Sequence, residues 1–149
     1  MTTAKDIMSK KVVSIEPSVS ATEVAKLMDR NNVSCVVLML NEEPYGIITE
    51  RDLLSKITAL NKRSSEIKAE EIMSSPVTLV SSFTPTDEVA QKMVENKIRR
   101  VVVVDGHQPV GIITVTDFVK HLNSILEDFD DYKKDLYQSL IDEYDHWKG

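Results

Sequence analysis

One seven-residue frame occurs twice in this chain, and it places the strongest constraint on the fold. Residues 46–52 read Gly-Ile-Ile-Thr-Glu-Arg-Asp, and residues 111–117 read Gly-Ile-Ile-Thr-Val-Thr-Asp. The two copies lie 65 residues apart. At that spacing the surrounding blocks align without a gap, and roughly a third of the aligned positions are identical. The chain is therefore expected to contain two similar structural units.

Both blocks show the same order of expected elements, β-α-β-β-α. Short β-prone segments at 12–15 and 77–80 precede helices whose apolar residues recur at helical spacing. Val36–Leu40 and Val101–Val104 then indicate strands that are buried on both faces, and Gly-Ile-Ile forms a third strand before a second helix. A block of about 60 residues is marginally stable alone. We therefore predict a mixed α/β fold in which two such units pack as a pseudo-twofold pair.

These blocks define a first repeat at residues 1–60, a linker at 61–70, a second repeat at 71–125 and a C-terminal extension at 126–149. The net charge of the chain is −6. The extension has eight acidic residues and three lysines, so it carries −5 of that charge. We expect the extension to be an acidic, amphipathic helix.

Apolar side chains recur three or four residues apart through this region, which predicts a helix of about 30 residues. A kink at 123–124 or 130–131 is compatible with the pattern. A stripe this long needs a cover, and we expect a homodimer or another partner contact to supply it. Packing on its own module is the alternative. The stripe consists of Leu122, Ile125, Leu126, Phe129, Tyr132, Leu136, Leu140, Tyr144 and Trp147.

Composition argues against several classes of function. The chain lacks the basic footprint that nucleic-acid binding usually requires. Its apolar runs are strand-sized, and a membrane span takes roughly 20 apolar residues. One cysteine excludes an internal disulfide, and the three histidines do not have metal-ligand spacing. The N-terminus lacks the apolar segment of a secretory signal, so we expect a cytoplasmic location.

Three stretches together resemble the cystathionine β-synthase (CBS) domain, whose tandem pairs are called Bateman modules. They are Asp-Ile-Met-Ser at 6–9, the strand sequence at 98–105, and the Pro-x-Gly-Ile-Ile-Thr-x-x-Asp segment. The resemblance covers roughly residues 3–125. Val102 stands where proline is common in the family, and the first repeat has no basic residue at 33–35.

This resemblance implies a regulatory module rather than an enzyme. Many members bind an adenosine-containing ligand (AMP, ADP, ATP or S-adenosylmethionine) in two clefts between the repeats. They commonly dimerise into a flat disk, while other members have no known ligand. We expect neither a required cofactor nor a bound metal.

Thr114 and Asp117 have two interpretations. Their spacing predicts a capping box, in which Thr114 caps a helix and the Asp117 carboxylate binds back to the cap. The family resemblance implies that Asp117 accepts hydrogen bonds from the two ribose hydroxyls of the ligand, and a carboxylate has the acceptor oxygens for that task. The roles are compatible because one oxygen can cap while the other stays free.

The neighbouring candidates are contacts for a phosphate. Thr116 makes the second copy similar to the nucleotide-binding repeats of the AMP-activated protein kinase γ subunit, although a second helix cap is its other interpretation. Arg51 occupies the same place in the first repeat, where it would pair with phosphate or with Glu50 as an exposed ion pair. Arg99 and Arg100 are either phosphate contacts or a solvated strand entrance. By resemblance, Arg99 is the better candidate for the second-repeat site.

The resemblance further implies that the adenine lies against the first strand of the opposite repeat. Taken alone, the valines of these strands would be interpreted as core. Ser34 stands where an arginine would be in the first repeat, so we rank the Asp117 site above the Asp52 site. The expected groups are Asp117 with Lys11, Val12 and Val13, and Asp52 and Thr49 with Pro76, Val77 and Thr78.

The sequence therefore predicts a ligand-sensing module that passes a conformational signal to an unidentified protein partner. The alternative is a ligand-free dimerisation or interaction module that acts through its sheet faces and C-terminal helix. An enzyme is the weakest interpretation, because no nucleophile–base arrangement is evident.

Overall fold

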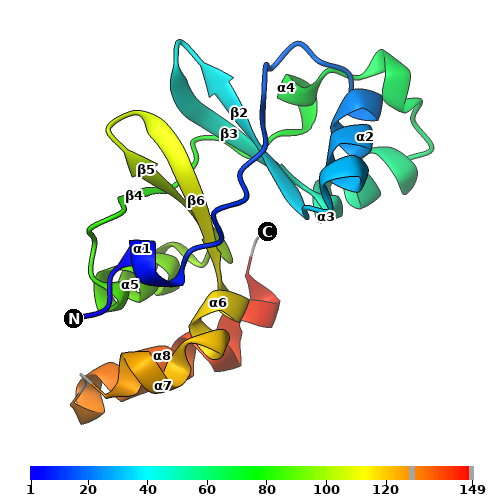
Figure 1. Cartoon of the computed structure of the whole chain (residues 1–149). Coiled ribbons are helices and arrows are strands. Elements are labelled where there is room, and N and C mark those ends of the chain that lie inside the picture. Colours follow the sequence, from blue (N-terminus) through cyan, green and yellow to red (C-terminus); the bar gives the residue numbers. More distant parts are fainter. Residues whose placement is uncertain (128–129, 148–149) are drawn as a thin grey trace. The chain divides into compact units, whose positions relative to one another are not determined.

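The computed structural model describes residues 1–127 and 130–147 and contains two three-stranded sheets flanked by helices (Figure 1). In each sheet the first two strands are parallel and the last two are antiparallel. This confirms the predicted mixed α/β class. The first sheet is β1 (Ser14–Ile15), β2 (Cys35–Leu40) and β3 (Glu43–Thr49), and the second is β4 (Leu79–Ser81), β5 (Arg100–Asp105) and β6 (Gln108–Thr114).

The helices follow the predicted β-α-β-β-α order in both repeats. In the first repeat, α2 (Ala21–Asn31) joins β1 to β2, and α3 (Glu50–Leu53) follows β3 and continues as a π-helical turn, η1 (Leu54–Thr58). In the second repeat, α5 (Thr86–Asn96) joins β4 to β5, and α6 (Val115–Lys120) follows β6.

The chain divides into two compact units. We call Lys11–Val77 the first-repeat unit, and Met1–Lys10 together with the chain from Thr78 onward the second-repeat unit. The first ten residues thus belong to the unit that contains the second sheet. Figure 1 shows their helix α1 (Ala4–Ile7) beside β6 and α5.

Backbone hydrogen bonds explain why the first residues of each repeat belong to the unit that contains the sheet of the other repeat. The N–H of Ser9 donates to the carbonyl of Ile112 in β6 at 2.9 Å. At the equivalent place in the first-repeat unit, the N–H of Ser74 donates to the carbonyl of Ile47 in β3 at 2.9 Å. Ser74 follows a short helix, α4 (Ala69–Ile72). Each Met-Ser segment therefore docks on the Gly-Ile-Ile strand of the other repeat.

The glycine of the repeated frame is where this docked segment approaches most closely. A Cβ placed on Gly111 would overlap the Met8 side chain, with Cγ only 2.7 Å away. A Cβ on Gly46 would lie 2.6 Å from Sδ of Met73. These distances are too short for real Cβ contacts. The glycine is therefore present in both copies because a methionine side chain occupies the space that a larger residue would need.

The segment between the repeats also packs on the first-repeat unit. It contains a short 3₁₀ turn, η2 (Ser64–Glu66). The Ser64 hydroxyl lies 2.6 Å from the Thr22 hydroxyl at the start of α2, and Ala69 N–H donates to the Val19 carbonyl at 2.7 Å. The predicted linker is thus held against α2 by specific polar contacts.

The C-terminal extension differs from the single long helix that we expected. It forms α7 (Leu122–Leu126), α8 (Asp131–Glu143) and a 3₁₀ turn, η3 (Tyr144–His146). His121 ends α6 in a non-helical conformation, and the carboxylate of Asp130 starts α8 by accepting the N–H of Lys133 at 3.1 Å. The second break agrees with the suggested kink at 130–131, whereas the first lies at His121 rather than at 123–124.

Because the helix restarts at Asp130, its buried face also differs from the predicted stripe. Tyr137, which is not part of the stripe, is only 1% exposed, while Tyr132 is 75% exposed. Leu140 and Trp147 are buried as expected, and Phe129 lies outside the described residues. These side chains join the core of their own unit, around Phe118. The expectation that this stripe needs a cover from another chain is therefore wrong for its buried part.

In the described ranges, no helix combines the length and the apolar character needed to cross a membrane.

Candidate functional site

Thr114 and Asp117 form the capping box that their spacing predicts. The backbone N–H of Thr114 donates to Oδ2 of Asp117 at 2.8 Å, and the Thr114 hydroxyl lies 3.3 Å from the same oxygen. Within residues 1–127 and 130–147, Oδ1 of Asp117 has no hydrogen bond or ion pair. The carboxylate is half-buried, and Thr116 beside it is exposed. One oxygen thus fixes the start of α6 while the other remains an available acceptor.

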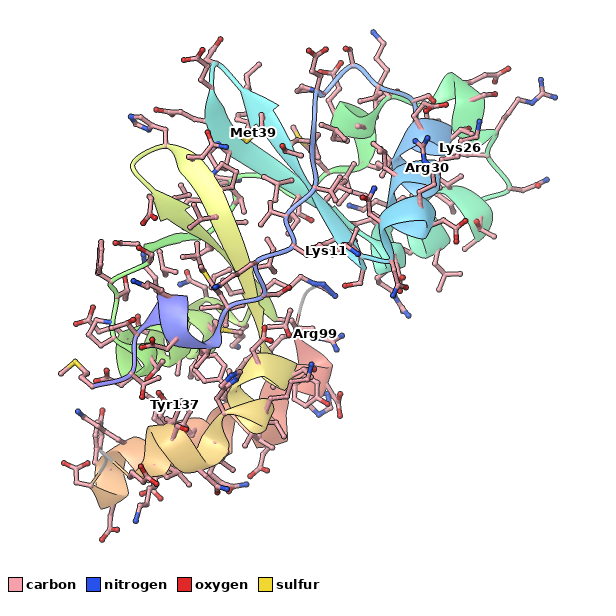
Figure 2. All side chains as sticks on the ribbon, viewed as in Figure 1. Lys11, Lys26, Arg30, Met39, Arg99 and Tyr137 are labelled. Atoms are coloured by element: carbon pink, nitrogen blue, oxygen red, sulfur yellow. The ribbon has the colours of Figure 1, made fainter. Side chains whose placement is uncertain are left out.

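The two arginines have different surroundings. Arg100 is paired directly with Thr114 across β5 and β6, and its Nε and Nη1 are buried without a hydrogen-bond partner in the described part of the chain. Arg99 instead places its guanidinium carbon 5.3 Å from the centre of the Tyr144 ring. Figure 2 shows Arg99 beside the C-terminal segment drawn in red. The arginine opposite Thr114 in the sheet is therefore Arg100, and the assignment of Arg99 as the better phosphate contact stays a prediction.

The first repeat contains the same capping box, but both carboxylate oxygens of its aspartate, Asp52, have partners within the protein. Thr49 N–H donates to Oδ2 of Asp52 at 2.9 Å, and Asp52 N–H donates to the Thr49 hydroxyl at 3.2 Å. Oδ1 of Asp52 forms an ion pair with Lys56 at 3.0 Å. The ammonium of Lys56 also donates to the Ile72 carbonyl at 2.8 Å. Both oxygens of Asp52 are consequently engaged within the protein.

Lys56 was not a predicted site residue, although a pattern in the sequence could have identified it. It follows Asp52 by four residues, a spacing at which opposite charges meet on a helix. The equivalent position in the second repeat is His121, whose Nδ1 lies 2.9 Å from the backbone carbonyl oxygen of Asp117. His121 thus contacts the backbone of Asp117 and, in the part of the chain that the structure describes, makes no hydrogen bond or ion pair with the Asp117 carboxylate.

A further difference concerns the surface between the two helices of each repeat. In the first-repeat unit, a pocket of about 390 Å³ lies between α2 and α3. Its lining residues are Ala25, Met28, Asp29, Asn32, Val33, Ser34, Glu50 and Leu53. Most of the equivalent residues, 65 positions later, contribute to the core that α8 completes in the second-repeat unit; they include Ala90, Met93, Val94, Ile98, Val115 and Phe118. Helix α8 therefore covers a surface that is open in the first-repeat unit.

The remaining candidates lie in the first-repeat unit. Arg51 is exposed and makes no ion pair with Glu50. The carbonyl of Val13 accepts the N–H of Val37 at 2.9 Å, which aligns this segment with β2. The contribution of both sequence segments to a ligand slot stays a prediction. The segments are Lys11, Val12 and Val13, and Pro76 and Val77.

Two ionisable side chains near these elements have perturbed pKa values. The Thr3 N–H, which donates to Asp6 at 2.8 Å, lowers the pKa of that carboxyl. Burial raises the pKa of the Tyr137 phenol, and the Asp87 carboxylate adds to the effect, while a hydrogen bond with Thr86 opposes it. No group of three or more His, Cys, Asp or Glu residues in the described ranges could hold a metal ion.

Comparison with known proteins gives relatives with the same architecture. An uncharacterised protein from Methanopyrus kandleri is 34% identical over 117 residues, which are 77% of this chain and 60% of the relative. The structure of a hexameric CBS-CP12 protein from bloom-forming cyanobacteria has a TM-score of 0.79 and 27% identity, and the match covers 91% of this chain and 79% of that one. The CBS domain protein PAE2072 from Pyrobaculum aerophilum, solved in complex with AMP, has a TM-score of 0.70 and 25% identity over 93% of this chain and 99% of that one.

The family model for the CBS domain matches this chain twice, at residues 4–59 and 69–124. These two matches contain the two sheets, the two docked Met-Ser segments and both capping boxes. The chain belongs to the CBS domain family and carries a tandem pair of these domains.

Proposed function

We propose that this protein is a regulatory module that binds an adenosine-containing ligand at Asp117. The observation that carries the proposal is the available Oδ1 of Asp117, held in place by the capping contacts of Oδ2 at 2.8 Å. A ribose diol presents two hydroxyl donors, and a fixed carboxylate oxygen accepts them without a further conformational cost. The relative from Pyrobaculum aerophilum binds AMP, which supports this ligand class.

Arg100 supports a negatively charged group on the ligand. Two of its guanidinium nitrogens are buried without a partner, and burial of an unpaired charge is unfavourable. A phosphate near Thr114 would provide acceptors for these nitrogens, and the exposed hydroxyl of Thr116 would add a donor. We therefore favour AMP, ADP or ATP over S-adenosylmethionine, which has no phosphate.

The two repeats are proposed to differ in this function. At Asp52 a ligand hydroxyl would have to displace Lys56 from Oδ1, and Ser34 occupies the position equivalent to Arg99. We propose that Asp117 forms the ligand site and that Asp52 mainly stabilises the start of α3.

A thermal-shift panel of AMP, ADP, ATP and S-adenosylmethionine tests the proposal. Ligand at 100 times its dissociation constant stabilises the folded state by about 2.7 kcal/mol. For a chain of this size, that corresponds to a shift in Tm on the order of 5–10 °C. A flat response to all four compounds would contradict the proposal and favour the ligand-free interaction module.

Matched variants identify the carboxylate that is responsible. Asp117→Asn retains an oxygen that can accept the Thr114 N–H but replaces the second oxygen with a donor, so it should abolish the shift while leaving the Tm without ligand nearly unchanged. Asp52→Asn is the control and should retain the shift. Loss of the response in Asp52→Asn alone would assign the ligand to the other repeat.

Association with further copies of this chain and a cytoplasmic location complete the proposal. The related cyanobacterial structure is hexameric, which supports self-association. Light scattering of the full chain with and without AMP measures the assembly directly. A monomeric mass under both conditions would contradict this part.

A further inference from the structure

The C-terminal segment, residues 130–147, contacts the same helix that carries Asp117. Phe118 follows Asp117 in α6, and its ring centre lies 5.5 Å from that of Tyr137 in α8. Leu140 and Trp147 are buried in the same cluster. Figure 2 shows Tyr137 within this C-terminal layer. The first turn of α6 therefore holds the proposed ribose contact and, at the next residue, a contact to α8.

The same segment also contacts Arg99, one of the two arginines that the sequence predicts as phosphate contacts. The guanidinium of Arg99 lies over the Tyr144 ring, with 5.3 Å from Cζ to the ring centre. A ring face attracts a cation through its quadrupole, and the interaction favours a guanidinium that is partly removed from water. Arg99 is half-buried and meets that condition. A phosphate and the Tyr144 ring would compete for this side chain.

The negative charge of the segment would also oppose the binding of a phosphate near Arg99. Asp142 and Glu143 are the two residues before Tyr144, and Asp145 is the residue after it. Within residues 130–147 there are six acidic residues and two lysines, and Lys133 lies 3.5 Å from Asp87 of α5. A docked segment of this charge repels a phosphate near Arg99, and salt would weaken that repulsion.

We propose that the C-terminal segment is the regulatory element of the Asp117 site, with its docked position opposing the binding of the nucleotide phosphate through Tyr144. This inference rests on the proposed function. Binding of a nucleotide releases Arg99 from Tyr144 and loosens η3 and the end of α8. By thermodynamic linkage, displacement of the segment raises nucleotide affinity by the same factor by which nucleotide weakens docking. The loosened segment is then available to contact a protein partner when nucleotide is bound.

Calorimetric titration of AMP into four full-length variants tests this coupling. Tyr144→Leu keeps an apolar side chain but removes the ring face, and it should lower the dissociation constant of AMP roughly two- to fivefold, the range expected for one cation–π contact. Tyr144→Phe keeps the ring and should bind AMP like the wild type. In an Arg99→Ala background, Tyr144→Leu should have no effect. Unchanged or weaker AMP binding by Tyr144→Leu would overturn the inference.

Hydrogen exchange of the unmodified protein gives an independent measurement. With AMP present, amides in residues 140–147 should exchange faster, while those of β5 and β6 become better protected. Slower exchange at 140–147 would overturn the inference even if every variant folds poorly. If AMP binds and Asp117→Asn abolishes binding, but neither the affinity nor the exchange behaves as described, the inference fails and the proposed function stands. If the wild type binds no nucleotide, both fail.

Discussion

The carboxylates of Asp52 and Asp117 occupy the same place in two copies of one fold, yet their second oxygens have different partners. In the first repeat Oδ1 pairs with Lys56 at 3.0 Å, while in the second repeat His121 stands four residues after the aspartate and contacts a backbone carbonyl instead. The capping contacts are nearly the same, at 2.9 and 2.8 Å. The repeated frame itself therefore serves the fold, and one residue outside it decides whether an acceptor remains available.

The surfaces behind these carboxylates differ as well. Helix α8 fills the surface between α5 and α6, whereas the surface between α2 and α3 holds an open pocket of about 390 Å³. The C-terminal segment therefore makes the second repeat a unit with an additional core layer.

The largest effect is expected from the additional layer. Leu140 is fully buried, and Leu140→Ala should destabilise the protein by about 2–5 kcal/mol because it leaves a cavity in the core cluster that also contains Phe118. Urea denaturation measures the loss, and hydrogen exchange should locate it in β5 rather than β2. The control, Tyr132→Ala, changes a side chain that is 75% exposed and should cost less than about 0.5 kcal/mol. Equal loss of protection in both sheets would contradict the expectation that α8 stabilises the second-repeat unit in particular.

The docked methionines should respond differently to an added methyl group. Gly111→Ala should cost about 1–3 kcal/mol, because the new Cβ overlaps Cβ, Cγ and Sδ of Met8. Gly46→Ala should cost less, since its worst overlap is with the movable Sδ of Met73 at 2.6 Å.

Urea midpoints of the two glycine variants measure this difference. Shortening the methionine in the double variant Met8→Ala, Gly111→Ala should recover part of the loss, which would show coupling between the two positions. Additive costs in the double variant would argue against the steric explanation.

Transfer of a single residue should make the second repeat resemble the first. In His121→Lys, the ammonium group should pair with the free oxygen of Asp117, as Lys56 does with Asp52. AMP affinity should then fall about tenfold, which corresponds to about 1.4 kcal/mol. Calorimetry measures the change, and Ser124→Lys on the exposed face of α7 is the control for added charge. Equal affinities of the two variants would show that Oδ1 does not contact the ligand.

The smallest effect at neutral pH concerns Tyr137. Its pKa in the folded protein is raised above the ordinary value of 10.0, so the unfolded chain loses this proton first as the pH increases. The stability of the second-repeat unit should therefore be insensitive to this group below about pH 10 and decline above it. Tyr137→Phe should remove that decline in urea midpoints measured between pH 8 and 11. A decline of the same size in the variant would assign it to other groups.

Much of the fold and part of the site follow from local sequence patterns. The strands, their order along the chain and the capping box of Thr114 and Asp117 depend on spacings within a few residues, so the sequence pattern predicted them correctly. The buried face of α8 was harder to predict, because a break at Asp130 changes the helical phase and brings Tyr137 rather than Tyr132 inward. The relation of Arg99 to Tyr144 spans 45 residues, and no local rule indicates it.

Two copies of one β-α-β-β-α unit, and a capped helix after the last strand of the second copy, can be predicted from the amino-acid sequence alone. Those features follow from apolar periodicity and from short-range hydrogen bonding. The folded structure was needed to show that Met8 and Met73 occupy the space next to the two glycines, that Lys56 pairs with the second oxygen of Asp52, and that Oδ1 of Asp117 stays available. These outcomes depend on which side chains approach one another across the fold, and that information is absent from any single stretch of the sequence.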